Sequence, residues 1–95
     1  MLKVECQKNV ITVDGDLKVF DDFEQIRECL DRLKGYKSII LKLLNSKNIT
    51  SSLLGYLYKL KEKDNIAVEV VVKNDELFEL LDDLNINFEI KKLDE

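Results

Sequence analysis

Apolar and polar residues alternate along the first part of the chain with the period of a β-strand. This pattern predicts strands over Leu2–Cys6 and Val10–Val13, because successive strand side chains point to opposite faces of a sheet. The two runs are close in sequence, so we expect them to pair as a hairpin around Lys8-Asn9. Asp14-Gly15-Asp16 closes the second run with a turn.

Three later segments carry apolar residues at the spacing of an amphipathic helix. The first helix is expected to begin near Asp21 or Asp22, which supply a capping carboxylate, and to stop at Gly35. The second follows Ser51-Ser52, and Asn74 caps the third. The predicted apolar stripes are Phe23, Ile26, Leu30 and Leu33; Leu53, Leu54, Leu57 and Leu60; and Leu77, Leu80, Leu81 and Leu84.

Three more strands fall between and after these helices. Ser38–Leu44 is almost continuously apolar, which predicts a central strand covered on both faces. Ile66–Val72 is rich in β-branched residues, and Ile86–Ile90 alternates like a half-exposed edge strand. The order is β-β-α-β-α-β-α-β. It predicts a single α/β domain over residues 1–95, with helices packed on a mixed, mostly parallel sheet.

Charge and composition narrow the classes of partner. The formal net charge is −4 and the isoelectric point is near 4.9, which argues against binding nucleic acid or an anionic membrane. No apolar run approaches the roughly 20 residues of a membrane span, and Met1–Glu5 lacks the apolar stretch of a signal peptide. Cys6 and Cys29 stand far apart, as expected of reduced thiols in a cytoplasmic protein. Cys29 is expected to be a small core residue.

The usual chemical motifs are missing from the sequence. It contains no histidine, no CxxC pair and no glycine-rich phosphate-binding loop. The strand ends Leu44-Asn45 and Val72-Lys73 carry no carboxylate, and Asp82-Asp83 is expected to lie on the solvated face of the last helix. We therefore expect a protein that binds another protein, with no enzymatic activity, no cofactor and no metal site.

The start of the second predicted helix differs from the other two. Thr50, Ser51 and Ser52 place hydroxyls there but no carboxylate, whereas the third helix opens with Asp75 and Glu76. The positive end of the helix dipole is then free to favour an added anion. A phosphate on a serine would add a charge of about −1.5 to −2. The alternative is that Ser51 or Ser52 simply caps the helix without modification.

These features together resemble the STAS domain, the fold of bacterial anti-sigma factor antagonists that also occurs at the tails of sulfate transporters. The resemblance runs from the first strand to Ile90 and includes the Asp14–Leu17 turn, the apolar strand Ile39–Leu44 and the segment Asn48–Gly55. The family signature at this helix start is Asp-Ser-Ser/Thr-Gly-Leu-Gly. The resemblance implies that the serine after the aspartate is phosphorylated by a partner kinase, often itself an anti-sigma factor. Aligned on Leu54-Gly55, that serine is Ser51.

Two residues depart from the family signature, so two interpretations of the function stay open. Thr50 stands where the family has aspartate, and Leu53 where it has glycine. In the first interpretation the unphosphorylated chain binds its partner and phosphorylation of Ser51 releases it. In the second the chain is a constitutive docking subunit of a transport, lipid-trafficking or signalling complex. We expect a monomer or weak dimer, and the predicted partner-binding residues are Asn48, Thr50, Ser51, Ser52, Leu53, Leu54 and Tyr56.

Overall fold

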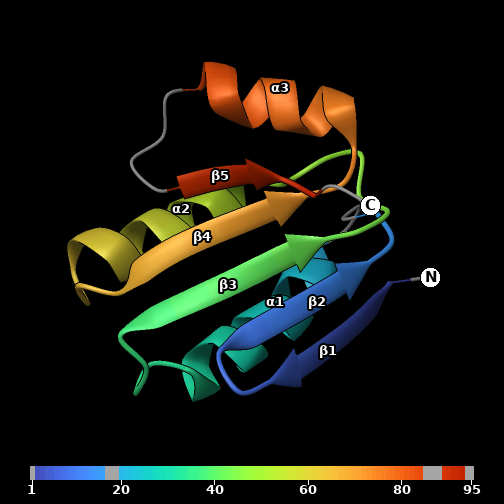
Figure 1. Cartoon of the computed structure of the whole chain (residues 1–95). Coiled ribbons are helices and arrows are strands. Elements are labelled where there is room, and N and C mark those ends of the chain that lie inside the picture. The colour runs from blue at the N-terminus through green and yellow to red at the C-terminus, as the bar shows by residue number, and fades with distance from the viewer. Residues whose placement is uncertain (1, 17–19, 85–88, 94–95) are drawn as a thin grey trace.

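Eight elements follow one another in the order that the sequence pattern predicts (Figure 1). The computed structural model describes residues 2–16, 20–84 and 89–93. The elements are β1 (Lys3–Gln7), β2 (Val10–Asp14), α1 (Phe20–Arg32), β3 (Ser38–Leu43), α2 (Ser51–Glu62), β4 (Ala67–Val72), α3 (Asp75–Asp83) and β5 (Glu89–Lys92). The predicted α/β class is confirmed.

The five strands form one mixed sheet in the order β1-β2-β3-β4-β5. β1 and β2 pair antiparallel as the predicted hairpin, and each later pair of neighbours is parallel. Lys8 takes a left-handed backbone conformation in the hairpin turn, with φ 53°. The Asn9 side-chain amide donates a 3.1 Å hydrogen bond to the Ser38 carbonyl, which ties this turn to the start of β3.

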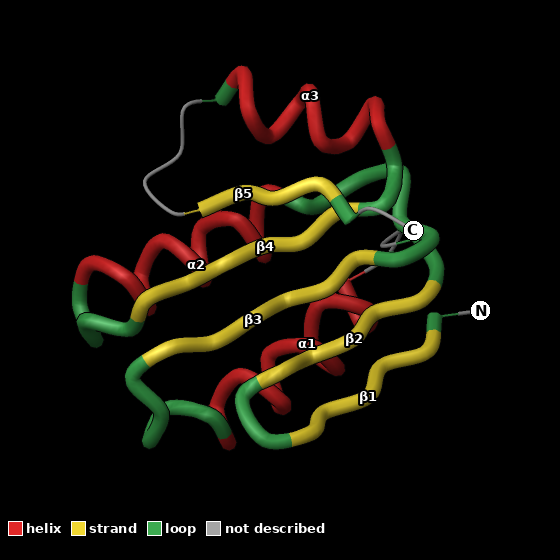
Figure 2. Tube along the Cα trace, in the orientation of Figure 1, coloured by secondary structure: helices red, strands yellow, loops and turns green. Residues whose placement is uncertain are grey.

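The topology leaves one face of the sheet without any of the described helices. From β2 onward the chain always moves to the next strand in the same direction, and connections of this kind are almost always right-handed. Successive helices are therefore expected on the same side. Figure 2 shows α1 and α2 behind one face of the sheet, while α3 lies beside the β5 edge. Because the strand order of these five strands never reverses, they have no topological switch point, where open α/β sheets usually hold ligands.

The hydrophobic core lies between the sheet and the helices. Every second strand residue points into it, and the apolar stripes of the helices cover those residues. Its fully enclosed strand and helix residues include Ile11, Val13, Ile39, Leu41, Leu43, Val70, Val72, Ile26, Leu30, Leu53, Leu57, Leu60 and Leu81. None of the helices in the described part of the chain has the length and apolar character needed to cross a membrane.

The predicted two-sided burial of the central strand is wrong. β3 does lie in the middle of the sheet, but Ile40 and Lys42 point to the face without helices and are only half-buried. The apolar run does not reveal this difference, because both faces of β3 carry apolar residues although only one face is fully buried. Such alternation is typical of a sheet covered on one side.

The helix ends also differ from the predictions. α1 begins at Phe20, close to the predicted start near Asp21 or Asp22, but it ends at Arg32 before reaching Gly35. Leu80 and Leu84 of the predicted apolar stripe are each 48% exposed. Of the predicted last strand, residues 86–88 lie outside the described residues. The strand observed there, Glu89–Lys92, does lie at the sheet edge as expected.

Candidate functional site

Thr50 is the N-cap of α2. Its backbone is extended, with φ −81° and ψ 151°, and its hydroxyl accepts a 3.2 Å hydrogen bond from the Leu53 amide. Ser51 and Ser52 occupy the first two helical positions, and both are exposed. The alternative in which one of these serines caps the helix is therefore wrong, because Thr50 is the N-cap.

Removing the Thr50 hydroxyl is expected to weaken the chain measurably. The Thr50→Ala variant leaves the Leu53 amide without its acceptor, so the free energy of unfolding should fall by about 1 kcal/mol. Thr50→Ser keeps an acceptor and should retain most of the stability. Urea unfolding measures both variants, and equal stability of Thr50→Ala and the wild type would contradict the assigned cap.

The first turn of α2 carries positive polarity that no carboxylate offsets. The helix has no acidic residue in this turn, while Lys59 and Lys61 sit in its last turn, where cations suit the dipole. By contrast, α3 opens with Asp75 and Glu76. The first amide groups of a helix have no acceptor within the helix itself. An anion added to Ser51 would thus meet a favourable field.

The loop before α2 is fastened to the turn that follows β2. Ser46 is fully buried in this contact, and Gly15 adopts φ 124°, a conformation that residues with a Cβ rarely take. The three hydrogen bonds are Asn45 Nδ2 to Asp14 Oδ1 (2.5 Å), Ser46 Oγ to the Gly15 carbonyl (2.5 Å) and the Lys47 amide to Asp16 Oδ1 (2.6 Å). The predicted turn therefore positions the segment that presents Ser51, a role that no local sequence signal indicates.

Leu53 is not part of the surface. Its side chain is 0% exposed and belongs to the core, so the prediction that it contacts a partner is corrected. It lies one turn before Leu57, which is also fully buried, and the helical period puts both on the same face. Leu54 is half-buried and packs against the edge of the core. Asn48 is exposed and Thr50 is half-buried.

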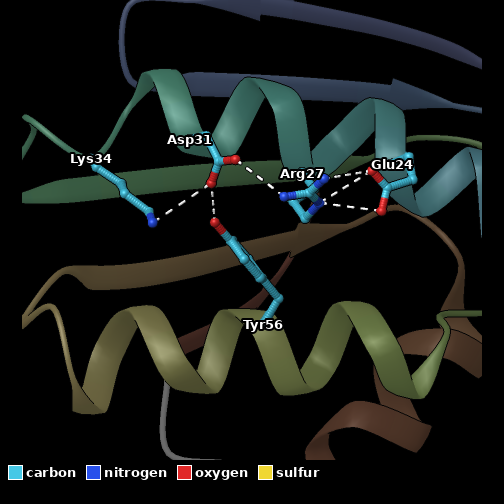
Figure 3. A network of polar contacts seen from close by, with 5 residues as sticks. All are labelled: Glu24, Arg27, Asp31, Lys34 and Tyr56. Atoms are coloured by element: carbon cyan, nitrogen blue, oxygen red, sulfur yellow. Dashed lines mark hydrogen bonds and ion pairs between the residues drawn. The ribbon is translucent and has the colours of Figure 1, made fainter.

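Tyr56 joins α2 to α1. Figure 3 shows its side chain rising from α2 toward α1, where its hydroxyl donates to the Asp31 carboxylate. Asp31 also forms ion pairs with Arg27 at 3.4 Å and Lys34 at 3.7 Å, and Arg27 pairs with Glu24 at 2.7 Å. The Lys34 ammonium lies 5.9 Å from the centre of the Tyr56 ring. Tyr56 thus helps to fix the position of the helix that carries Ser51.

Ionisation of Tyr56 should link stability to pH. Burial first, and then the hydrogen bond to Asp31, raises the pKa of Tyr56 from 10.0 to about 12. Between these values the unfolded chain has lost the phenol proton and the folded chain still holds it, so stability falls as pH rises. The stabilisation that the protonated Tyr56 hydroxyl gives is fully present below pH 10 and is lost as the pH rises toward 12.

The Tyr56→Phe variant tests this linkage. It cannot lose a proton at this position, so the stability difference between the wild type and the variant should shrink between pH 10 and 12. Unfolding in urea below pH 10 and within that window gives the two differences. Tyr58→Phe, at an exposed position of the same helix, is the control. A wild-type advantage that stays constant across the window would contradict the linkage.

A shallow depression lies beside the loop that leads to α2. It has a volume of about 300 Å³ and is lined by Leu44, Asn45, Lys47, Lys73 and Asn74, at the ends of β3 and β4. Two lysines and two amides offer cations and hydrogen-bond donors to an anionic side chain. Within the described residues, no three Cys, Asp or Glu side chains gather as a metal site would require.

Ser51 and Ser52 therefore stand on an open corner built by the α2 start, its Thr50 cap and the fastened loop. The hydroxyls of both serines lack a hydrogen-bond partner among the described residues. A scan against protein-family models found no match, and searches among curated proteins and solved structures found none either. What characterises this chain is thus its α/β fold with a one-sided, five-stranded mixed sheet and an exposed helix start carrying two serines.

Proposed function

We propose that this chain is a protein-binding regulatory domain of the STAS type, resembling an anti-sigma factor antagonist. Its partner docks on the corner around the start of α2, and phosphorylation of Ser51 releases that partner. One observation carries this proposal. Ser51 exposes its hydroxyl in the first turn of a helix that Thr50 already caps and that has no carboxylate nearby in that turn.

The chemistry of the switch needs a kinase and ATP as co-reactants. The Ser51 oxygen attacks the γ-phosphorus of ATP, the bond from that phosphorus to the bridging oxygen breaks, and ADP leaves while a basic side chain of the kinase accepts the hydroxyl proton. The chain itself tolerates the product because the helix dipole and the first amides favour an anion there. The complex with a docked partner is destabilised by the same phosphate, because a buried charge left without a counter-charge costs about 3–5 kcal/mol.

Both departures from the family signature are compatible with the switch. Thr50 performs the capping task at the position where the family has aspartate. Leu53, at the position of the family's glycine, turns into the core and so adds no bulk to the corner. These two placements favour the switched interpretation over constitutive docking.

The proposed docking surface is small and mainly polar. Its exposed members are Asn48, Ser51 and Ser52, and Leu54 adds a half-buried apolar edge. The depression beside the loop suits an acidic side chain of the partner. The described strands provide no switch-point crevice for a small molecule, which supports a protein as the ligand.

Phosphoryl transfer to Ser51 is the direct test. The chain is incubated with ATP and each serine kinase whose gene is found near its own, and mass spectrometry of the peptides locates any added phosphate. We expect one phosphate on Ser51 in the wild type and none in Ser51→Ala. Absence of phosphate, or phosphate on Ser52 alone, would contradict the proposal. If the chain takes no phosphate yet still binds that kinase, constitutive docking is the better interpretation.

A further inference from the structure

β1 forms one edge of the sheet and is open on its outer side. Figure 1 shows it as the outermost strand, and none of the other described elements lies beyond it. It pairs with β2 over five consecutive residues without a bulge, and it contains no proline. Because bonded and unbonded residues alternate in an antiparallel pair, about half of its backbone N–H and C=O groups face away from β2. Such an edge can accept a further strand.

The opposite edge of the sheet is better protected. β5 has only four residues, and α3 lies beside it (Figure 2). Two of its side chains already form ion pairs, Lys91 with Glu69 at 3.0 Å and Lys92 with Asp75. Short length, charge and a covering helix all hinder the addition of a strand. β1 is therefore the edge at which pairing is favoured.

We propose that the β1 strands of two copies of this chain pair antiparallel around a two-fold axis, which makes their sheets continuous. The occupant is a second copy because β1 complements itself. In one register Lys3 lies opposite Glu5 of the second copy, and Glu5 opposite its Lys3. Both side chains are exposed, and neither has an ion pair among the described residues. The same register sets the two Val4 residues opposite each other, and Leu2 opposite Cys6.

The two faces of β1 disfavour the neighbouring registers. Leu2, Val4 and Cys6 line the side that packs against the core, where they are only half-buried. A slip of one residue would bring these apolar side chains opposite polar and charged ones. A slip of two residues would set Glu5 opposite Glu5, or Lys3 opposite Lys3, and like charges in opposite positions destabilise a strand pair.

The dimer is expected to be weak. A contact made by a few strand residues buries less than the about 1,200–2,000 Å² of stable complexes, and two chains of net charge −4 repel each other. We therefore expect a dissociation constant of about 0.1–1 mM. None of the pairing residues belongs to the docking corner around Ser51, so this dimer and the proposed switch can each fail without the other.

Concentration dependence of the wild type is the first test. Sedimentation equilibrium measures the average mass between about 20 µM and 1 mM, and we expect it to rise from 11.1 kDa to at least about 1.5 times that value. The NMR amide signals of Lys3–Gln7 should shift over the same range. A mass that stays at 11.1 kDa, or signals that shift only in other elements, would overturn the proposal.

Two charge reversals test the pairing of Lys3 with Glu5. Lys3→Glu and Glu5→Lys each set like charges opposite each other in a dimer of identical chains, so each variant alone should stay monomeric at about 1 mM. An equal mixture should associate at least as readily as the wild type, because each strand then complements the other. Damage to the fold of either variant cannot produce this recovery.

The remaining outcomes contradict the proposed pairing. Variants that dimerise alone as the wild type does would place the interface elsewhere, and folded variants that do not associate on mixing would rule out this register. A monomeric wild type whose β1 signals shift only when one of the kinases tested for phosphorylation is added would assign the edge to that partner. If a variant fails to fold, the wild-type mass and amide signals still decide.

Discussion

Replacing Leu53 by alanine is expected to lower the free energy of unfolding by about 2–5 kcal/mol. Leu53 is fully enclosed by the core between the sheet and α2, so its removal leaves a cavity where the remaining side chains cannot fully close in. The total stability of a chain of this length is about 5–14 kcal/mol. This one change would therefore remove a large share of it.

The neighbouring Leu54 provides a matched control. It stands next to Leu53 on the same helix but is only half-buried, so Leu54→Ala should cost less than half as much. Urea unfolding of the two variants gives the comparison, and equal losses would show that Leu53 is not enclosed as described. It follows that Leu54→Ser, and not a change at Leu53, is suited to probing the docking surface without disturbing the fold.

Replacing Ser51 by aspartate is expected to change folding and binding in opposite directions. A carboxylate in the first turn of α2 meets uncompensated positive polarity, so the free energy of unfolding should rise by about 0.3–1 kcal/mol. In the complex the same charge is buried against the partner, so the dissociation constant should rise about a hundredfold or more. Unfolding in urea and calorimetric titration with the partner kinase measure the two effects.

The opposite signs make this variant informative. A variant that merely damaged the fold would lose stability and binding together. Ser51→Asn, close in shape but uncharged, should bind nearly as tightly as the wild type. Ser52→Asp places the charge one residue further along the same exposed turn and separates a position-specific effect from a general one. Unchanged binding by Ser51→Asp would contradict the switch and favour constitutive docking.

The order of elements was predictable because strands and helices repeat with different periods. The alternation in β1 and β2 and the leucine spacing in α2 were enough to place them. The one-sided burial of β3 was not predictable from its own residues, since Ile40 is as apolar as its buried neighbours. What leaves it partly exposed is the one-directional strand order, which is a property of the whole chain.

The candidate site was predictable in position but not in detail. Three hydroxyls in a row mark the start of α2, but only the extended backbone of Thr50 decides which one caps it. The turn around Gly15 was recognised as a turn, while its bonds to the distant Ser46 loop have no local signature.

Amide hydrogen exchange of the chain, alone and bound to the partner kinase, tests the proposed docking corner most directly. In the free chain the Ser51 and Ser52 amides belong to the first helical turn, which lacks intrahelical acceptors, so they should exchange fast. We expect the partner to slow exchange from Asn48 through Ser52 and phosphorylation of Ser51 to abolish this protection. Protection confined to the open face of the sheet or to α3, with no change at Ser51, would contradict the account.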